Sequence, residues 1–348
     1  MTGNVSSDAL GAVIDEELDL DATTSRGLTN HLPMALVAKA GLGAPREELE
    51  RFSLKYRRRL VPAPDPTDRL TPLTWRGAIG RVDAYVNLSE YFTREIEERG
   101  VDATLRAHLD ELVDGVAGAA FHGVIRLAYA LDVASPRRVA TGLAYLASTA
   151  MSLGPLEDGT ITGDDPEALL RALAAEWEGR ADDAVGNIAA RMRYVAEQPR
   201  FAAVAASLSL DATTQVRLSD AALRVYASTD DFTALHGVTG LEAISRLRPY
   251  VAGVERLDRS TFQALAAAYL SIGAPDIWST ARLSEMADHS TLEESEVATR
   301  AAFSDDEHVA KIVFTSRRLN AATSNPLYRA VAERAVLGDR APGDAPRC

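Results

Sequence analysis

The stretch LRAHLDELVDGV, residues 105–116, has the residue pattern that decides the fold class. Its apolar residues recur at steps of three and four, at Leu105, Leu109, Leu112, Val113 and Val116. This spacing is typical of the buried face of a helix. The same spacing returns along most of the chain, and the alternating runs of β-strands are scarce. The sequence therefore predicts an all-α protein.

Helix boundaries and breaks indicate one large domain. Ser304 with Glu307, and Ser290 with Glu293, have the spacing of a capping box at a helix start. The Pro-rich segment 61–82 and the segment 153–166, rich in Gly, Asp and Pro, interrupt the helical pattern. Neither is long or polar enough to force a domain boundary. We expect a single multi-helix domain over residues 21–337, with tails at 1–20 and 338–348.

Charge and composition exclude several classes of function. The net charge is −13 and the isoelectric point is near 5.0, so nucleic acid and anionic lipid are unfavourable partners. No apolar run approaches the ~20 residues that span a bilayer. The only cysteine is Cys348, which rules out a disulfide within the chain. The first thirty residues are acidic where a secretory signal is basic and apolar, so we expect a cytoplasmic protein.

Four of the six histidines lie in similar apolar, helix-like surroundings. They are His31, His122, His236 and His308. His122 and His236 sit in matching segments, FHGVIRL and LHGVTGL, and each is followed by a glycine. A glycine inside a helix costs ~1 kcal/mol, so its repeated use indicates close approach of another element or a ligand.

Two interpretations of these histidines stay open. A single inward-facing histidine is more often a core residue with a hydrogen-bond partner than a metal ligand. Four such residues need four buried polar partners, and one shared metal ion would serve all of them. His108 and His289 are interpreted as structural, because His108 lies among charged residues and His289 precedes a predicted cap.

Lys311 follows His308 by three residues, so both side chains emerge from one helix face. Its apolar neighbours predict burial, and a buried lysine has a lowered pKa and becomes nucleophilic. Such an amine can react with carbon dioxide to form a carbamate, an anionic oxygen ligand. The alternatives are an ion pair with Asp306 or Glu307, or a side chain that extends to solvent.

The motifs around these residues resemble the questin oxidase-like family, whose members act on aromatic polyketides. The matching segments are NHLPMALV from Asn30, FHGVIRL from Phe121, LHGVTGL from Leu235 and EHVAKIV from Glu307. The resemblance implies oxidation of anthraquinone-type substrates by ring cleavage or by Baeyer–Villiger-like oxygen insertion. It also implies a non-haem Fe(II) site between helices, with His31, His122, His236, His308 and carbamylated Lys311 as ligands.

The hypothesis from the resemblance is therefore an iron-dependent oxygenase that uses dioxygen on a small aromatic polyketide. Apolar and aromatic side chains are expected to line the substrate site. The candidates are Tyr85, Tyr91, Phe92, Tyr129 and Phe232. Two other functions stay open: a helical zinc or manganese metallohydrolase, and a non-enzymatic helical binding protein whose histidines belong to the core.

Overall fold

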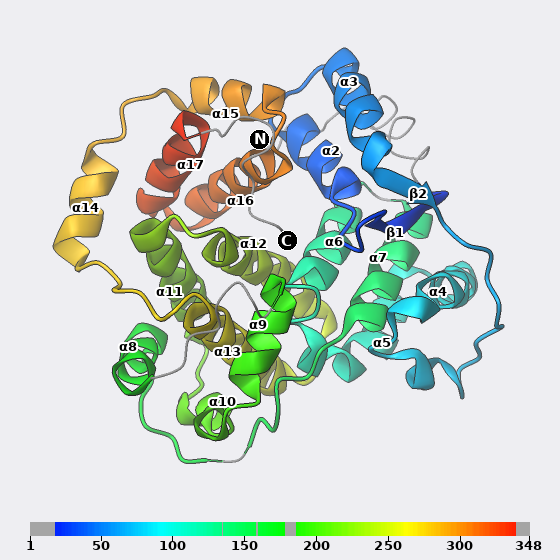
Figure 1. The fold of residues 1–348 in the computed structure, drawn as a ribbon, viewed down its shortest axis with the longest axis horizontal. Coiled ribbons are helices and arrows are strands. Elements are labelled where there is room, and N and C mark those ends of the chain that lie inside the picture. Colours follow the sequence, from blue (N-terminus) through cyan, green and yellow to red (C-terminus); the bar gives the residue numbers. More distant parts are fainter. Residues whose placement is uncertain (1–17, 134, 158, 178–185, 339–348) are drawn as a thin grey trace. The chain divides into compact units, whose positions relative to one another are not determined.

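The computed structural model describes residues 18–133, 135–157, 159–177 and 186–338. Helices dominate these residues, which confirms the predicted all-α class (Figure 1). The exception is one antiparallel strand pair, in which Leu20 lies opposite Pro62 and Thr24 opposite Leu60. Most residues of the two predicted tails lie outside the described part of the chain.

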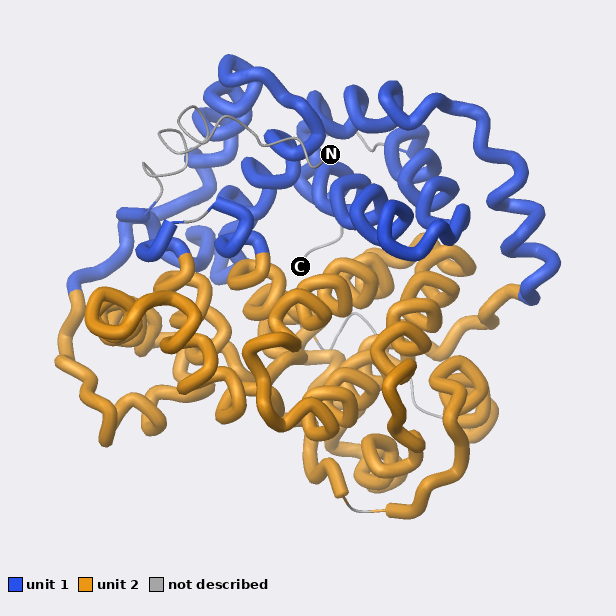
Figure 2. Tube along the Cα trace, turned by 180° about the vertical axis from the view of Figure 1, so that it is seen from behind, with its two compact units in different colours: residues 1–65, 129–138, 279–348 blue, residues 66–128, 139–278 orange. Residues whose placement is uncertain are grey.

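The chain divides into two compact units, each described here by itself (Figure 2). Unit 1 comprises residues 1–65, 129–138 and 279–348, and unit 2 comprises residues 66–128 and 139–278. Helices α6 (His122–Leu131) and α7 (Pro136–Thr149) contribute residues to both. The prediction of a single domain over residues 21–337 stays a prediction.

The elements wholly within unit 1 come from both ends of the chain. They are β1 (Leu20–Thr24), α2 (Leu32–Gly41), α3 (Arg46–Tyr56), η1 (Arg57–Arg59), β2 (Leu60–Pro62), α14 (Thr280–Asp288), α15 (Glu294–Phe303), α16 (Glu307–Thr323) and α17 (Leu327–Leu337).

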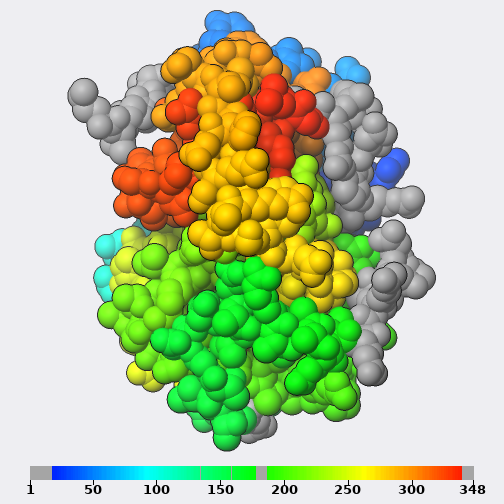
Figure 3. Space-filling model, turned by 90° about the vertical axis from the view of Figure 1, so that its left-hand side faces the viewer, coloured from blue at the N-terminus to red at the C-terminus, as the bar shows by residue number. Residues whose placement is uncertain are grey.

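Helix α16 forms the centre of unit 1 and contacts α2, α15 and α17. A Cβ on Gly41 of α2 would meet the Phe314 ring of α16 at 2.3 Å, so the glycine permits this close approach. The α16 residues Ile312 and Val313 are fully buried. Helix α14 buries only Leu283 and lies at the surface beside α17 (Figure 3, gold beside red).

The middle of the chain forms unit 2. Its elements are η2 (Trp75–Ala78), η3 (Val82–Ala84), α4 (Tyr85–Arg99), α5 (Val101–His108), η4 (Leu109–Glu111), η5 (Val113–Gly115), α8 (Pro166–Glu176), α9 (Ile188–Ala196), η7 (Pro199–Phe201), α10 (Val204–Ser207), α11 (Thr214–Thr229), α12 (Phe232–Leu247), η8 (Arg248–Tyr250) and α13 (Val254–Ser271).

Helices α11, α12 and α13 pack side by side in unit 2 (Figure 1). Their mutual faces are apolar, and Leu241, Ile244 and Ala264 are almost fully buried. Such burial of apolar surface is the main stabilising contribution to a helical core. None of the helices in the described segments has the length and apolar character needed to cross a bilayer.

Two local predictions differ from the structure. The stretch 105–116 is not one α-helix: α5 ends at His108, and the 3-10 turns η4 and η5 follow. The apolar residues remain buried because steps of three also fit a 3-10 helix. Ser304 and Ser290 are not the cap residues either. The caps are Asp306 for α16 and Glu293 for α15, each nearer to the helix than predicted.

Candidate metal centre

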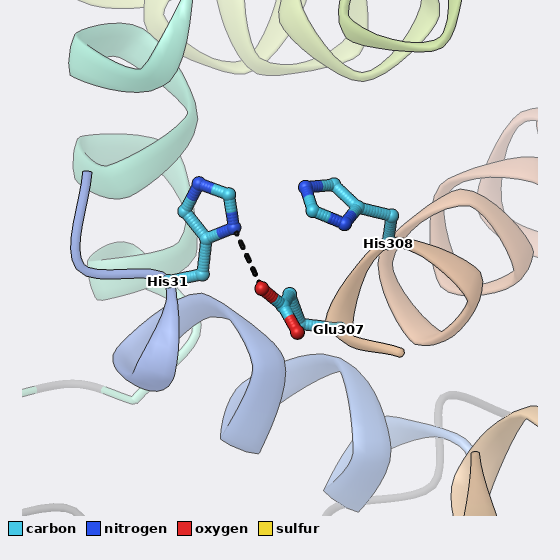
Figure 4. Close-up of side chains that lie close together, drawn as sticks. All are labelled: His31, Glu307 and His308. Carbon is cyan, nitrogen blue, oxygen red and sulfur yellow. Dashed lines mark ion pairs between the residues drawn. The ribbon is translucent and has the colours of Figure 1, made fainter. Parts of the chain in front are cut away.

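The first cluster of possible ligands lies in unit 1, where α2 and α16 begin. Figure 4 shows the side chains of His31, Glu307 and His308 pointing toward one another. One ligand atom from each of the three lies within 4.8 Å of the others, and all three residues are buried. The His31 and His308 rings are 4.8 Å apart between centroids. Two imidazoles and a carboxylate at such distances can bind a divalent metal.

Carboxylates face the Nδ1 atoms of both rings. Asp306 Oδ1 lies 2.9 Å from Nδ1 of His308, and Glu307 Oε1 lies 3.4 Å from Nδ1 of His31. A carboxylate only accepts, so the contact with Asp306 places the proton of a neutral His308 ring on Nδ1 and its ligand lone pair on Nε2. Asp306 also caps α16 by accepting the His308 backbone N–H at 2.8 Å. The same residue therefore starts the helix and orients its histidine.

The environment of Asp306 favours its ionised form. Burial alone would raise the pKa of this carboxyl group. The hydrogen bonds from the side chain and backbone of His308 outweigh burial, and the pKa lies below its usual value. An ionised Asp306 is the stronger acceptor for the imidazole N–H.

Lys311 lies in the same helix and is 1% exposed. Its side chain does not extend to solvent, which removes one of the alternatives for this residue. The chain contains a second buried lysine, Lys39 of α2. Lys39 forms an ion pair with Glu48 at 3.0 Å and donates to the Ser304 carbonyl at 2.7 Å. Burial lowers the pKa of Lys39 although Glu48 opposes the shift.

The second pair of histidines lies in unit 2. His122 is the first residue of α6, and His236 lies one turn inside α12. Their ring centroids are 4.6 Å apart, and both rings are buried. Nδ1 of His122 lies 2.5 Å from the Ala119 carbonyl, and Nδ1 of His236 lies 2.7 Å from the Phe232 carbonyl. These contacts again place the ring proton on Nδ1 and the lone pair on Nε2.

The backbone before His122 has an unusual conformation. Ala119, Ala120 and Phe121 have φ values of 47°, 56° and 67°, in the left-handed region that L-residues rarely adopt. This run turns the Ala119 carbonyl toward His122 at the start of α6. Such strain, of order 1–3 kcal/mol per residue, persists where the surrounding structure enforces it.

Glycines near the pair permit close packing, but not always where expected. A Cβ on Gly123 would meet Leu146 Cα at 3.0 Å, which confirms a close approach by α7. At Gly237 the nearest atom is Leu265 Cδ1 at 3.7 Å, an ordinary contact, so close packing by the protein does not explain this glycine. The tight position on α12 is Gly240, where a Cβ would lie 2.7 Å from Phe121 Cβ.

The other two histidines differ from these four. His108 is buried with both ring nitrogens in contact with protein groups: the Thr104 carbonyl at 2.8 Å and the Tyr91 hydroxyl at 3.2 Å. His289 is exposed at the end of α14. Both therefore have the structural character that the sequence predicts.

The five predicted substrate-site residues pack against aromatic, histidine or hydroxyl neighbours within their own units. Tyr91 and Phe92 pack with Trp75 around His108, and burial raises the pKa of Tyr91 to about 12. Phe232 contacts the His236 ring at 4.7 Å between centroids. Tyr85 packs against Tyr145, and the Tyr129 hydroxyl lies 3.3 Å from Thr315 Oγ1. That these five residues line a substrate site stays a prediction.

Sequence reasoning missed three residues. Asp306 and Glu307 were interpreted only as helix-start residues or as ion-pair partners of Lys311, although their position beside His308 was a usable signal. Arg126 belongs to the FHGVIRL motif, whose pattern does not distinguish it from a surface arginine. It is buried, 7% exposed, one turn after His122.

Comparison with known proteins identifies related sequences. A stretch of 136 residues is 30% identical to a questin oxidase from Aspergillus terreus (strain NIH 2624 / FGSC A1156). The match covers 34% of this chain and 29% of that protein. The model of the family described as questin oxidase-like matches residues 28–315, which is most of the chain. The chain therefore belongs to the questin oxidase-like family.

Proposed function

We propose that this protein is an oxidoreductase that uses dioxygen to oxidise an anthraquinone-type aromatic polyketide at a non-haem iron site. The proposed ligands are His31, His122, His236 and His308, with carbamylated Lys311 as the anionic ligand. The reaction is ring cleavage or insertion of oxygen beside a ketone. Iron supplies the redox chemistry that allows dioxygen to react with an electron-rich aromatic ring.

One observation carries most weight in this proposal. Three of the four proposed histidine ligands, His122, His236 and His308, have a hydrogen-bonded oxygen at Nδ1, and a carboxylate oxygen lies 3.4 Å from Nδ1 of His31. Each of the four is at most 5% exposed. Ligand histidines in metal sites usually donate their other ring N–H to a carboxylate or backbone carbonyl in this way. A nitrogen-rich ligand set with one anionic oxygen suits a first-row transition metal such as iron.

The chain's own residues have distinct roles in this proposal. Asp306 and Glu307 orient His308 and His31, and the backbone carbonyls of Ala119 and Phe232 orient His122 and His236. Burial of the ligands limits access of water. Glu307 also lies close enough to His31 and His308 to serve as the carboxylate ligand in place of Lys311, so the test must separate these two residues.

The test is metal content by mass spectrometry, on protein purified without a histidine tag in bicarbonate buffer. We expect about one iron per chain, since the four histidines are proposed to share one ion. Iron-loaded protein should consume oxygen when a reduced hydroxyanthraquinone is added. Two irons per chain would mean that the two histidine pairs are separate sites.

Other results would support the alternatives. Stoichiometric zinc or manganese without oxygen consumption would favour a metallohydrolase. Absence of metal even after anaerobic iron loading, with thermal stability unchanged by chelators, would favour a helical binding protein with core histidines.

The role of Lys311 has a matched control in Lys39, the other buried lysine. In ¹³C-bicarbonate, we expect a carbamate NMR signal that disappears in Lys311→Met and persists in Lys39→Met. Lys311→Met should also lower iron affinity, with partial rescue by an added short carboxylate. If iron binding survives Lys311→Met but not Glu307→Gln, Glu307 is the anionic ligand instead.

A further inference from the structure

Arg126 is a buried cation that has no acidic partner in the described part of the chain. It lies in α6 within unit 2, and no described acidic side chain is within ion-pair distance of its guanidinium. Within the described residues its guanidinium makes one hydrogen bond, from Nη2 to the Tyr85 hydroxyl at 3.5 Å. The buried Nη1 has no hydrogen-bond partner among the residues that the structure describes. An arginine keeps its charge at any physiological pH.

Two other cations of this chain, the buried Lys39 and the partly exposed Arg248, are paired with acids. Lys39 pairs with Glu48 at 3.0 Å, and Arg248 in unit 2 pairs with Asp258, with Nη2 and Oδ2 at 3.0 Å. Removing a charge from water is costly unless an opposite charge and hydrogen bonds compensate it. Among the residues that the structure describes, Arg126 has no such counter-charge, which distinguishes it from Lys39 and Arg248.

Aromatic rings surround the guanidinium instead. Its Cζ lies 5.4 Å from the Tyr145 ring centroid and 5.9 Å from that of Tyr85, and the two rings are 6.1 Å apart. Cation–π contacts offset only part of the desolvation of a charge. Two aromatic faces next to an uncompensated guanidinium suit a ligand that is itself aromatic and carries an anionic oxygen.

Arg126 lies close along α6 to the proposed metal ligand His122. Arg126 follows His122 by one helical turn, so both side chains emerge from the same face of α6. We propose that Arg126, flanked by Tyr85 and Tyr145, binds an ionised phenolic oxygen of the aromatic substrate. This inference rests on the proposed function, because it names the form in which an anthraquinone-type substrate binds.

Direct binding tests the inference without turnover. Metal-free protein is titrated with a hydroxyanthraquinone, its methyl ether and an anthraquinone carboxylate, and binding is followed by absorbance. We expect the hydroxyanthraquinone to bind most tightly. Arg126→Met and Arg126→Gln should weaken its binding at least about tenfold, and Arg126→Lys by less. The methyl ether, which cannot ionise at that oxygen, should bind wild type and variants alike.

Thermal stability of the ligand-free protein supplies a second readout. If Arg126 serves a ligand, Arg126→Met removes an uncompensated charge, and the melting temperature should stay the same or rise. The control Arg248→Gln leaves the buried Asp258 without its partner, and its melting temperature should fall. A large fall for all three Arg126 variants would make Arg126 a structural residue and overturn the inference.

The outcomes also separate this inference from the proposed function. Equal binding of the hydroxyanthraquinone by wild type and Arg126 variants would overturn the role of Arg126 and leave the substrate class intact. If the Arg126 variants weaken binding of the anthraquinone carboxylate but not of the hydroxyanthraquinone, Arg126 does not bind a phenolic oxygen, and the inference is overturned. No binding of any of the three by wild type would overturn both proposals. Because the titration uses metal-free protein without turnover, failure of the iron proposal does not change the binding result.

Discussion

The two histidine pairs have different kinds of oxygen atom near Nδ1. In unit 1, the side chains of Glu307 and Asp306 face the Nδ1 atoms of His31 and His308. In unit 2, backbone carbonyls do so for His122 and His236. The first pair therefore depends on side chains that a substitution can remove. The second depends on backbone conformation, which only changes in packing or in φ can alter.

Removal of a whole pair should give the largest effect. We expect His31→Ala/His308→Ala and His122→Ala/His236→Ala each to weaken iron binding by more than ~100-fold. This is more than the loss expected when only a residue that hydrogen-bonds to a ligand is replaced. Anaerobic titration against a competing chelator measures this affinity. His108→Gln, a buried control, should lower stability but keep iron. If either double variant still binds one iron tightly, that pair is not part of a shared site.

Substitution of the carboxylates tests the unit 1 pair alone. Asp306→Asn keeps a good helix cap but weakens the acceptor for His308, so iron affinity should fall about 10–100-fold with little loss of stability. Glu307→Gln should act similarly through His31. Asp305→Asn is the control, because Asp305 pairs with Arg51 and Lys55 instead. Equal iron affinity in Asp306→Asn and wild type would show that this acceptor does not support a metal ligand.

The unit 2 pair should respond to packing, and two glycines of α12 give opposite expectations. Gly240→Ala places a Cβ 2.7 Å from Phe121 Cβ. Such overpacking costs about 1–3 kcal/mol and should also displace the adjacent His122, lowering iron affinity. Gly237→Ala meets only an ordinary contact at 3.7 Å, and its better helix propensity should add up to ~1 kcal/mol. Urea denaturation measures both, and destabilisation by the two alike would contradict the packing argument.

The sequence carries more information about the acceptors of the unit 1 histidines than about those of the unit 2 histidines. Apolar spacing predicted the helices, and the repeated motif around His122 and His236 marked these two histidines, because both leave local patterns; the full ligand set stays a prediction. Glu307 begins the motif that contains His308, and Asp306 directly precedes it, but both are ambiguous, since acids at a helix start are common for capping alone. The acceptors in unit 2 are backbone atoms with no residue signature. The residues Ala119, Ala120 and Phe121 carry no turn signal for their left-handed conformation, which the fold around them enforces.

The smallest expected effect concerns that left-handed run. Ala120 has φ 56°, a conformation that costs an L-residue roughly 1–2 kcal/mol and glycine almost nothing. Ala120→Gly should therefore stabilise the protein by up to about 1 kcal/mol, because glycine's greater unfolded-state entropy offsets part of the gain. Ala128→Gly, a buried control within α6, should destabilise it by about 1 kcal/mol. Calorimetry measures the melting temperatures of the Ala120→Gly and Ala128→Gly variants. If the left-handed run serves only to orient His122, Ala120→Gly should bind iron slightly more weakly while its melting temperature rises. The reason is that the relieved backbone no longer fixes the Ala119 carbonyl.

Destabilisation by Ala120→Gly would contradict this argument. It would mean that the left-handed conformation is not strained, and that the orientation of His122 rests on the packing of Phe121 against Gly240 alone.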